Sequence, residues 1–306
     1  MKRFVIRNLV FFGTLLIVLG SLCAVELYHE LAAYAKELAA PDTAEILVCN
    51  DSQLEMGVNP EVDAAFFNFS AAGRAMDQAR LAVQDVLEAN PGRFKKVLID
   101  ITPIIAIDAF DQPISKMGFA GQYYLLHWLH PRENTRRMDG QLAVFRDNMV
   151  GRRMRLLSRA LRGKAEFKSS IRGGFKPVDE TLAVARPKGF TAELDARARA
   201  VSRADPVSPQ SPIFRHAAEI VSLARAHGAE PVVVTSPWHE ALLSACAADR
   251  LEAFTAAVSA FAADHGCRYV DMLRLRFPDD CWYDSHHLNV KGAGLFTPLL
   301  HQEVCK

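Results

Sequence analysis

The feature that most constrains the fold is a repeated alternation of short apolar runs with longer stretches of helical periodicity. Five runs rich in Val, Ile, Leu and Phe lie at residues 44–50, 64–70, 95–102, 231–236 and 268–272. Helix-like stretches lie at residues 74–89, 213–227, 250–265 and 292–304. Strands that alternate with helices predict a parallel sheet, and strands that are apolar on both faces predict helices on both sides of it. We therefore expect an α/β protein.

The amino terminus carries a second strong signal. An uncharged run from Asn8 to Val25 follows three basic residues, Lys2, Arg3 and Arg7. A run of about 20 apolar residues can cross a bilayer, and basic residues on one flank place that flank in the cytoplasm. A cleaved signal peptide is the alternative, but the helical pattern continues beyond the run without a turn signal, which favours an uncleaved anchor. We predict an N-terminal transmembrane helix in the inner (plasma) membrane, spanning it once.

The remaining chain is expected on the periplasmic or extracellular side. Residues 1–40 form the predicted anchor and a helical stalk, and residues 41–306 form one α/β domain with a basic, loop-rich insertion at about 103–212. The insertion contains a stretch from Arg146 to Lys176 with ten basic residues against two acidic ones. Such a stretch is most often a solvated helix face, and our functional hypothesis is contact with anionic lipid headgroups or an acidic polymer beside the anchor.

Charge and cysteine content exclude several classes of protein. The 306 residues hold 36 Lys and Arg against 35 Asp and Glu, which argues against a nucleic-acid partner. The six cysteines form no C-x-x-C pair, so a zinc ribbon or a dithiol redox motif is excluded. Outside the inner membrane Cys246, Cys267 and Cys281 could form a disulfide, whereas Cys49 is expected to be a buried small hydrophobe.

Two short motifs carry residues suited to chemistry. Asp51 and Ser52 follow the first predicted strand, and residues 284–287 read Asp-Ser-His-His just before the last predicted helix. The carboxyl ends of parallel strands meet at one edge of a sheet, so these motifs should meet there. A serine, a histidine that takes its proton and a carboxylate that holds the histidine are the groups that nucleophilic acyl transfer needs.

The order and spacing of these motifs resemble the SGNH (GDSL-like) hydrolase superfamily, in particular its membrane-anchored cell-envelope branch. The first motif matches the family's Gly-Asp-Ser block, with Asn50 in place of the glycine, and the contexts NDSQLEMGVNP and WYDSHHLNVKGAGLF add to the likeness. The resemblance implies a flavodoxin-like sheet with Ser52 as nucleophile, His287 as base and Asp284 as the carboxylate. His286 is the competing base, and the Asp-x-x-His spacing favours His287.

The same resemblance implies three hydrogen-bond donors for the oxyanion. Ser52 and Gly73 would donate their backbone N–H groups. The third donor, an asparagine after the third strand, is missing, and Thr102 or Asn68 are the candidates to replace it. Loss of one oxyanion donor costs about 100- to 1,000-fold in rate, so this departure bears on whether the site is active.

Each motif also has a purely structural interpretation. Asp51 and Ser52 are common helix caps, and single histidines such as His239 are more often structural than functional. Taken together, the motifs predict a serine esterase or O-acyltransferase that acts on acyl esters, acetyl above all, of an envelope polysaccharide, with no cofactor and no metal. The alternative is a catalytically silent SGNH-like domain that binds glycan or partner proteins in an envelope assembly.

Overall fold

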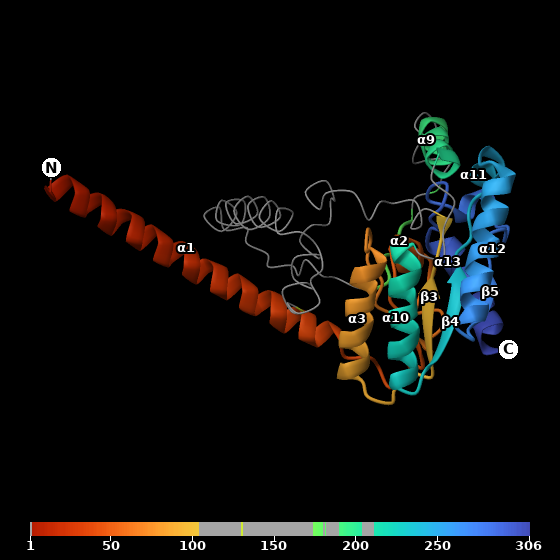
Figure 1. Cartoon of the computed structure of the whole chain (residues 1–306), viewed down its shortest axis with the longest axis horizontal. Coiled ribbons are helices and arrows are strands. Elements are labelled where there is room, and N and C mark those ends of the chain that lie inside the picture. The colour runs from red at the N-terminus through yellow and green to blue at the C-terminus, as the bar shows by residue number, and fades with distance from the viewer. Residues whose placement is uncertain (1, 104–129, 131–173, 180, 182–189, 204–210) are drawn as a thin grey trace.

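The computed structural model describes residues 2–103, 130, 174–179, 181, 190–203 and 211–306. Within these residues the chain forms a five-stranded, all-parallel sheet with helices on both faces (Figure 1). The strands are β1 (Ile46–Val48), β2 (Phe66–Asn68), β3 (Lys96–Asp100), β4 (Glu230–Thr235) and β5 (Arg268–Asp271), in the spatial order β2-β1-β3-β4-β5. All five predicted strands are confirmed, as is the α/β class.

The predicted helices are also present, with boundaries within two residues of those expected. They are α3 (Met76–Ala89), α10 (Pro212–Ala226), α12 (Ala248–Asp264) and α13 (Val290–Cys305). Further helices among the described residues are α1 (Lys2–Glu37), α2 (Ser52–Gly57), α9 (Phe190–Arg203), α11 (Glu240–Ala245) and the short 3-10 turn η4 (Asp279–Cys281).

The two faces of the sheet pack against different helices. Leu47, Val97 and Val233 face a core cluster shared with α3, α10 and α12. Val48 and Leu98 face the opposite cluster, which includes residues of α2 and α13. Because the inner strands β1, β3 and β4 are buried on both faces, their Val, Ile and Leu residues form continuous runs rather than alternating ones. The sheet is thus a rigid base for the loops at its carboxyl edge.

The N-terminal helix α1 extends away from the sheet domain (Figure 1). Its last turns are fixed to α3, since Tyr34 donates a hydrogen bond of 2.6 Å to an Asp85 carboxylate oxygen. Among the residues that the structure describes, no helix is long and apolar enough to cross a membrane. The predicted transmembrane helix therefore has no support from the structure.

Part of the predicted insertion is described and packs beside the carboxyl edge of the sheet. Ala198 and Val201 of α9 belong to a small buried cluster with Trp238, Leu242 and Leu273. Residues 146–173 of the basic stretch lie outside the described residues, so the lipid-contact hypothesis stays a prediction.

The cysteines of the described part are not paired. Cys246, Cys267 and Cys281 are free thiols, so the disulfide considered for them does not form in this structure. Cys49 is fully buried at the end of β1, as predicted, and burial raises the pKa of its thiol to about 11.

Candidate active site

The first predicted motif forms the start of a helix. Asp51 is the N-cap of α2, and its carboxylate accepts a hydrogen bond of 3.0 Å from the Gln53 N–H. This satisfies one of the amides that a helix leaves unpaired at its start. The cap interpretation of Asp51 is therefore confirmed, and it leaves the next residue, Ser52, half-buried on the first turn. The cap and the site use adjacent residues of one motif.

The second motif is a turn organised around one carboxylate. Asp284 accepts hydrogen bonds from the backbone N–H groups of His286, at 3.0 Å, and His287, at 2.9 Å. Its other oxygen lies 2.8 Å from His287 Nδ1. The turn thus fixes the imidazole to the carboxylate by backbone and side chain together, as a triad requires.

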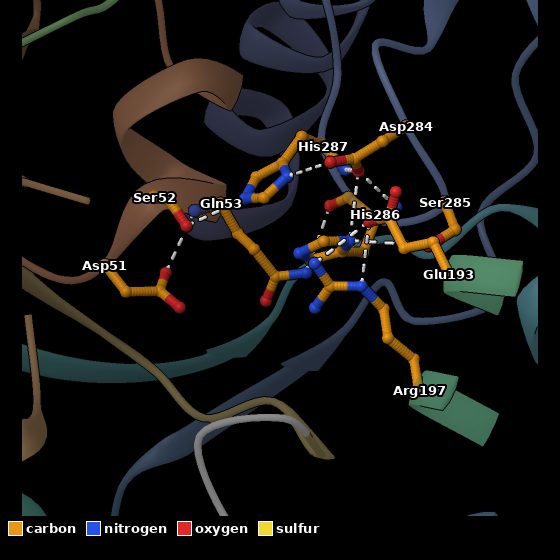
Figure 2. A network of polar contacts seen from close by, with 9 residues as sticks. All are labelled: Asp51, Ser52, Gln53, Glu193, Arg197, Asp284, Ser285, His286 and His287. Atoms are coloured by element: carbon orange, nitrogen blue, oxygen red, sulfur yellow. Dashed lines mark hydrogen bonds and ion pairs between the residues drawn. The ribbon is translucent and has the colours of Figure 1, made fainter. Parts of the chain in front are cut away.

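The two motifs meet although 235 positions separate them in the chain. His287 Nε2 lies 2.7 Å from Ser52 Oγ, so serine, imidazole and carboxylate form one hydrogen-bonded series (Figure 2). Asp284 is buried, whereas Ser52 and His287 are half-buried. The structure therefore brings all three predicted residues together, with the two reacting groups on the accessible side.

The charges of this series suit proton transfer through His287. Burial acts to raise the pKa of Asp284, but hydrogen bonds from His286 and His287 outweigh it and hold that pKa well below its ordinary range. The carboxylate is therefore ionised at neutral pH and stabilises an imidazolium on His287.

His286, the competing candidate for the base, is a buried structural residue of the Asp284 turn. Its ring is buried, its Nδ1 lies 3.0 Å from Asp284, and its backbone carbonyl accepts a hydrogen bond from Gln53 Nε2. Burial, together with the neighbouring His287, lowers the pKa of His286 to about 3. The ring is thus neutral and is hydrogen-bonded to Asp284, whereas the contact with Ser52 is made by His287 (Figure 2), so His286 does not compete as the base.

Asp284, His286 and His287 could also present one oxygen and two nitrogens to a metal ion, since their ligand atoms lie within 4.8 Å of one another. Their mutual contacts of 2.8 and 3.0 Å are direct hydrogen-bonding distances. Nitrogen and oxygen ligands of zinc lie about 2.0–2.2 Å from the ion, so their own separation exceeds these contacts in a tetrahedral site. The donor set as folded fits a hydrogen-bonded turn better than a metal site.

Gly73, one of the predicted oxyanion donors, lies in a turn after β2. In this turn the Ala71 N–H donates to the carbonyl of Asn50, two residues before Ser52, at 3.0 Å. The φ of Gly73, 70°, is the left-handed conformation that glycine adopts without strain. Within the described residues the Gly73 N–H has no hydrogen-bond acceptor assigned to it. The turn that contains Gly73 is therefore attached to the segment that leads into Ser52.

The two candidates for a third donor differ sharply. Asn68 Nδ2 donates to the carbonyls of Leu54 and Val58, at 2.8 and 2.7 Å, and its Oδ1 accepts from the Ser70 N–H. Its amide is fully used in holding α2, which argues against Asn68 as an oxyanion donor. Thr102 is fully buried, and its Oγ1 has no hydrogen-bond partner within the described structure. Thr102 thus keeps a free hydroxyl where β3 ends.

Two further acids lie at this edge and were not expected in the site. Burial and the nearby Asp51 carboxyl raise the pKa of Asp100 well above its ordinary value, and Asp100 accepts hydrogen bonds from Ser236 N and Oγ. Glu55, one turn beyond Ser52 on α2, is 8% exposed. The signal that would have pointed to Glu55 is a charged residue between the apolar Leu54 and Met56.

His239 is structural, as expected. It caps α11 by accepting a hydrogen bond of 3.1 Å from the Ala241 N–H, and its ring stands edge-on against Trp282. It also supports the site indirectly, because its backbone N–H donates to the Ser285 carbonyl at 3.1 Å.

Comparison with protein-family models gave no match, and comparison with curated proteins gave none either. The SGNH resemblance therefore rests on the motifs of this chain and on the geometry that they adopt.

Proposed function

We propose that the chain is a serine hydrolase or O-acyltransferase of the SGNH type. The observation that carries the proposal is the series Ser52 Oγ–His287 Nε2 at 2.7 Å and His287 Nδ1–Asp284 at 2.8 Å. Both distances lie in the range expected of a nucleophile, its base and the group that orients the base. The strand order is also that of flavodoxin-like folds, which place their sites at this edge.

In the proposed reaction Ser52 Oγ attacks the acyl carbonyl carbon while His287 Nε2 takes the hydroxyl proton. The resulting imidazolium is stabilised by Asp284, and the oxyanion by the N–H groups of Ser52 and Gly73 and the hydroxyl of Thr102. His287 then protonates the departing alcohol, and an acyl-serine remains. Water or a sugar hydroxyl then attacks the carbonyl carbon of the acyl-serine and gives its proton to His287. The acyl group leaves on the attacking oxygen, as a free acid or a new ester, and His287 returns the proton to Ser52 Oγ.

The substrate class of the proposal rests on the resemblance. Acyl esters of an envelope polysaccharide, with acetyl as the acyl group, are what the membrane-anchored branch of the family implies. A location at the inner membrane with the domain outside rests on the basic residues before the apolar run of α1.

Labelling with a fluorophosphonate tests the proposal, because the probe phosphonylates a serine only when a neighbouring base activates it. We expect one adduct, on the peptide that contains Ser52, and its loss in Ser52→Ala and His287→Ala. Ser222→Ala and His301→Ala serve as matched controls, since both residues lie away from the site and make their own local contacts. Absence of an adduct in the folded wild-type protein would refute the proposal.

A catalytically silent domain is the second candidate. The observation that favours it is the lack of an asparagine after β3, where the chain has Asp100, Ile101 and Thr102. This candidate predicts that the folded protein binds envelope glycan but neither labels at Ser52 nor releases acetate from acetylated polysaccharide. Loss of glycan binding in His287→Ala, without any turnover in the wild-type protein, would support it.

A further inference from the structure

Gln53 is a buried amide beside the nucleophile that the proposed reaction does not use. It follows Ser52 on the first turn of α2 and is 4% exposed. Its Nε2 donates a hydrogen bond of 3.1 Å to the backbone carbonyl of His286. Its Oε1 is buried and has no hydrogen-bond partner within the described structure. The contact with His286 is therefore what offsets the cost of burying this side chain.

This hydrogen bond joins the two segments that carry the triad. The nucleophile lies on α2, and the carboxylate and the base lie on residues 284–287, which we call the base turn. Within the described structure two hydrogen bonds connect the first turn of α2 with the base turn. One is the Gln53 contact, and the other is the 2.7 Å contact between Ser52 Oγ and His287 Nε2 (Figure 2).

The Gln53 contact acts on the base through one peptide unit. The carbonyl of His286 and the N–H of His287 belong to the same planar peptide group. Its carbonyl accepts from Gln53 Nε2, and its N–H donates to Asp284 Oδ1 at 2.9 Å. This peptide is thus held at both ends, by α2 on one side and by the triad carboxylate on the other.

The other anchors of the base turn do not reach α2. The Ser285 carbonyl accepts a hydrogen bond of 3.1 Å from the N–H of His239, the N-cap of α11. The Tyr283 N–H donates to the His287 carbonyl at 2.9 Å, within the same loop. The separation between the base and the nucleophile therefore depends on the Gln53 contact and on the reacting contact itself.

The reacting contact is lost during the proposed cycle. Once Ser52 Oγ is acylated it carries no hydrogen and cannot donate to His287 Nε2. The base has to stay in place nevertheless, because it takes a proton from the water or sugar hydroxyl that attacks the acyl-serine. The Gln53 contact involves neither reacting group, so acylation leaves its donor and its acceptor unchanged.

We propose that Gln53 is a positioning residue that holds the base turn against α2 while Ser52 is acylated. The inference rests on the proposed function, which supplies the acyl-serine. Gln53 does not touch the reacting atoms. It acts through the peptide between residues 286 and 287, and it keeps His287 within reach of the hydroxyl that completes the cycle.

The test compares the full-length wild-type chain with Gln53→Met, Gln53→His and the control Gln84→Met. Methionine is similar to glutamine in length but has no N–H, whereas histidine keeps an N–H at the ε position. Gln84 lies on α3 and donates to Glu88 of the same helix at 2.9 Å. Thermal melts establish that each variant is folded at the assay temperature. If Gln53→Met does not fold, Gln53→Asn, whose amide is one carbon shorter, takes its place.

The first readout is hydrogen exchange of the His286 and His287 amides, in each protein with and without Ser52→Ala, which removes the reacting contact. We expect Ser52→Ala alone to keep the protection of these amides, because Gln53 still holds the turn. Gln53→Met should lose about tenfold in protection, and more when it is combined with Ser52→Ala. Gln53→His and Gln84→Met should stay within about threefold of wild type.

The second readout is fluorophosphonate labelling of Ser52 as a function of probe concentration. Gln53→Met should lower the rate at saturating probe by about 10- to 100-fold, because the base is misplaced, and should leave the half-saturating concentration unchanged. Gln53→His should restore the saturating rate to within about threefold of wild type. Gln84→Met should match wild type in both quantities.

Two results would overturn the inference. If the His286 and His287 amides keep their wild-type protection in Gln53→Met, with and without Ser52→Ala, the Gln53 contact does not hold the base turn. If Gln53→His labels as slowly as Gln53→Met, the donated hydrogen bond is not the cause. A folded wild-type protein that never labels is a separate failure: it refutes the proposed function, and the contact loses its catalytic purpose whatever the exchange data show.

Discussion

Substitution of Gly292 tests how tightly α13 fits the loop that carries the triad. A β-carbon at Gly292 would stand 2.2 Å from the backbone carbonyl oxygen of Cys281 and 2.9 Å from Leu288 Cδ2. Ordinary contact begins near 3.4 Å, so the Cys281 carbonyl has to move by about 1.2 Å. The same carbonyl accepts a hydrogen bond of 3.0 Å from the Asn289 N–H, which this movement breaks.

The expected loss of stability follows from three terms. Forcing extra atoms into a packed site costs about 1–3 kcal/mol, and a lost hydrogen bond costs about 1 kcal/mol. Replacing glycine by alanine inside a helix returns about 0.5–1 kcal/mol. We therefore expect Gly292→Ala to lower the free energy of unfolding by about 1–3 kcal/mol.

Gly294 provides the matched control, because it lies two residues further along α13 and a β-carbon there meets nothing within 4 Å. Gly294→Ala should be neutral or raise the free energy of unfolding by up to about 1 kcal/mol. Urea unfolding followed by the fluorescence of the buried Trp282 measures both variants. Equal stability of the two would refute the packing argument.

The same substitution should also disturb chemistry at the site. The displaced carbonyl precedes the turn that holds Asp284 and His287, so the 2.7 Å contact with Ser52 should lengthen. A shift of about 1 Å can cost about 100-fold in rate. Fluorophosphonate labelling of Ser52 should therefore slow in Gly292→Ala, and Gly294→Ala should keep the wild-type rate.

Three further outcomes are expected. Asp284→Asn should slow Ser52 labelling by about 10³- to 10⁴-fold, because an amide neither holds the His287 ring in the required tautomer nor stabilises its positive charge. Labelling at the wild-type rate would contradict this. The pKa of Glu55 is raised by burial on folding, so its neutral carboxyl favours the folded state below about pH 4.5, and this contribution is lost as pH rises through about 7. Glu55→Gln should therefore be more stable than wild type at pH 8, by up to about 3 kcal/mol, but not at pH 4. An equal difference in stability between the two proteins at both pH values, measured by urea unfolding, would contradict this. Asn68→Ala should cost about 2–4 kcal/mol in urea unfolding, because two carbonyls and one amide lose their partner; a loss below about 0.5 kcal/mol would contradict it.

The sheet was predictable because its strands are short apolar runs that end at polar residues. Asn50 and Thr102 lie two residues beyond the ends of β1 and β3, and parallel strands bring such ends to one edge. That rule places Ser52 at this edge, and the two motifs taken together, with the SGNH resemblance, implied that His287 and Asp284 meet it there. The spacing of Asp284 and His287 further predicted a contact that a single turn can make.

Other parts of the site depend on contacts that no local pattern reports. The packing of α9 next to Trp238 and the anchoring of Lys176 on Glu55 join segments that lie far apart in the chain. The Asp-x-x-His spacing favoured His287 as the base, but it carried no signal for the burial of His286, which depends on the Asp284 turn. Asn68 looked like a free donor because its acceptors, the carbonyls at the end of α2, form only when that helix folds.

The nucleophile and its base lie 235 positions apart, near opposite ends of the 306-residue chain. During synthesis, therefore, a nascent polypeptide carries its serine long before it carries the histidine that activates it. The proposed chemistry switches on only when the C-terminal segment has been made and has docked against the sheet. If the proposed function holds, copies without a docked His287 segment should be inert, so labelling in a cell extract should report only molecules in which that segment is present and folded.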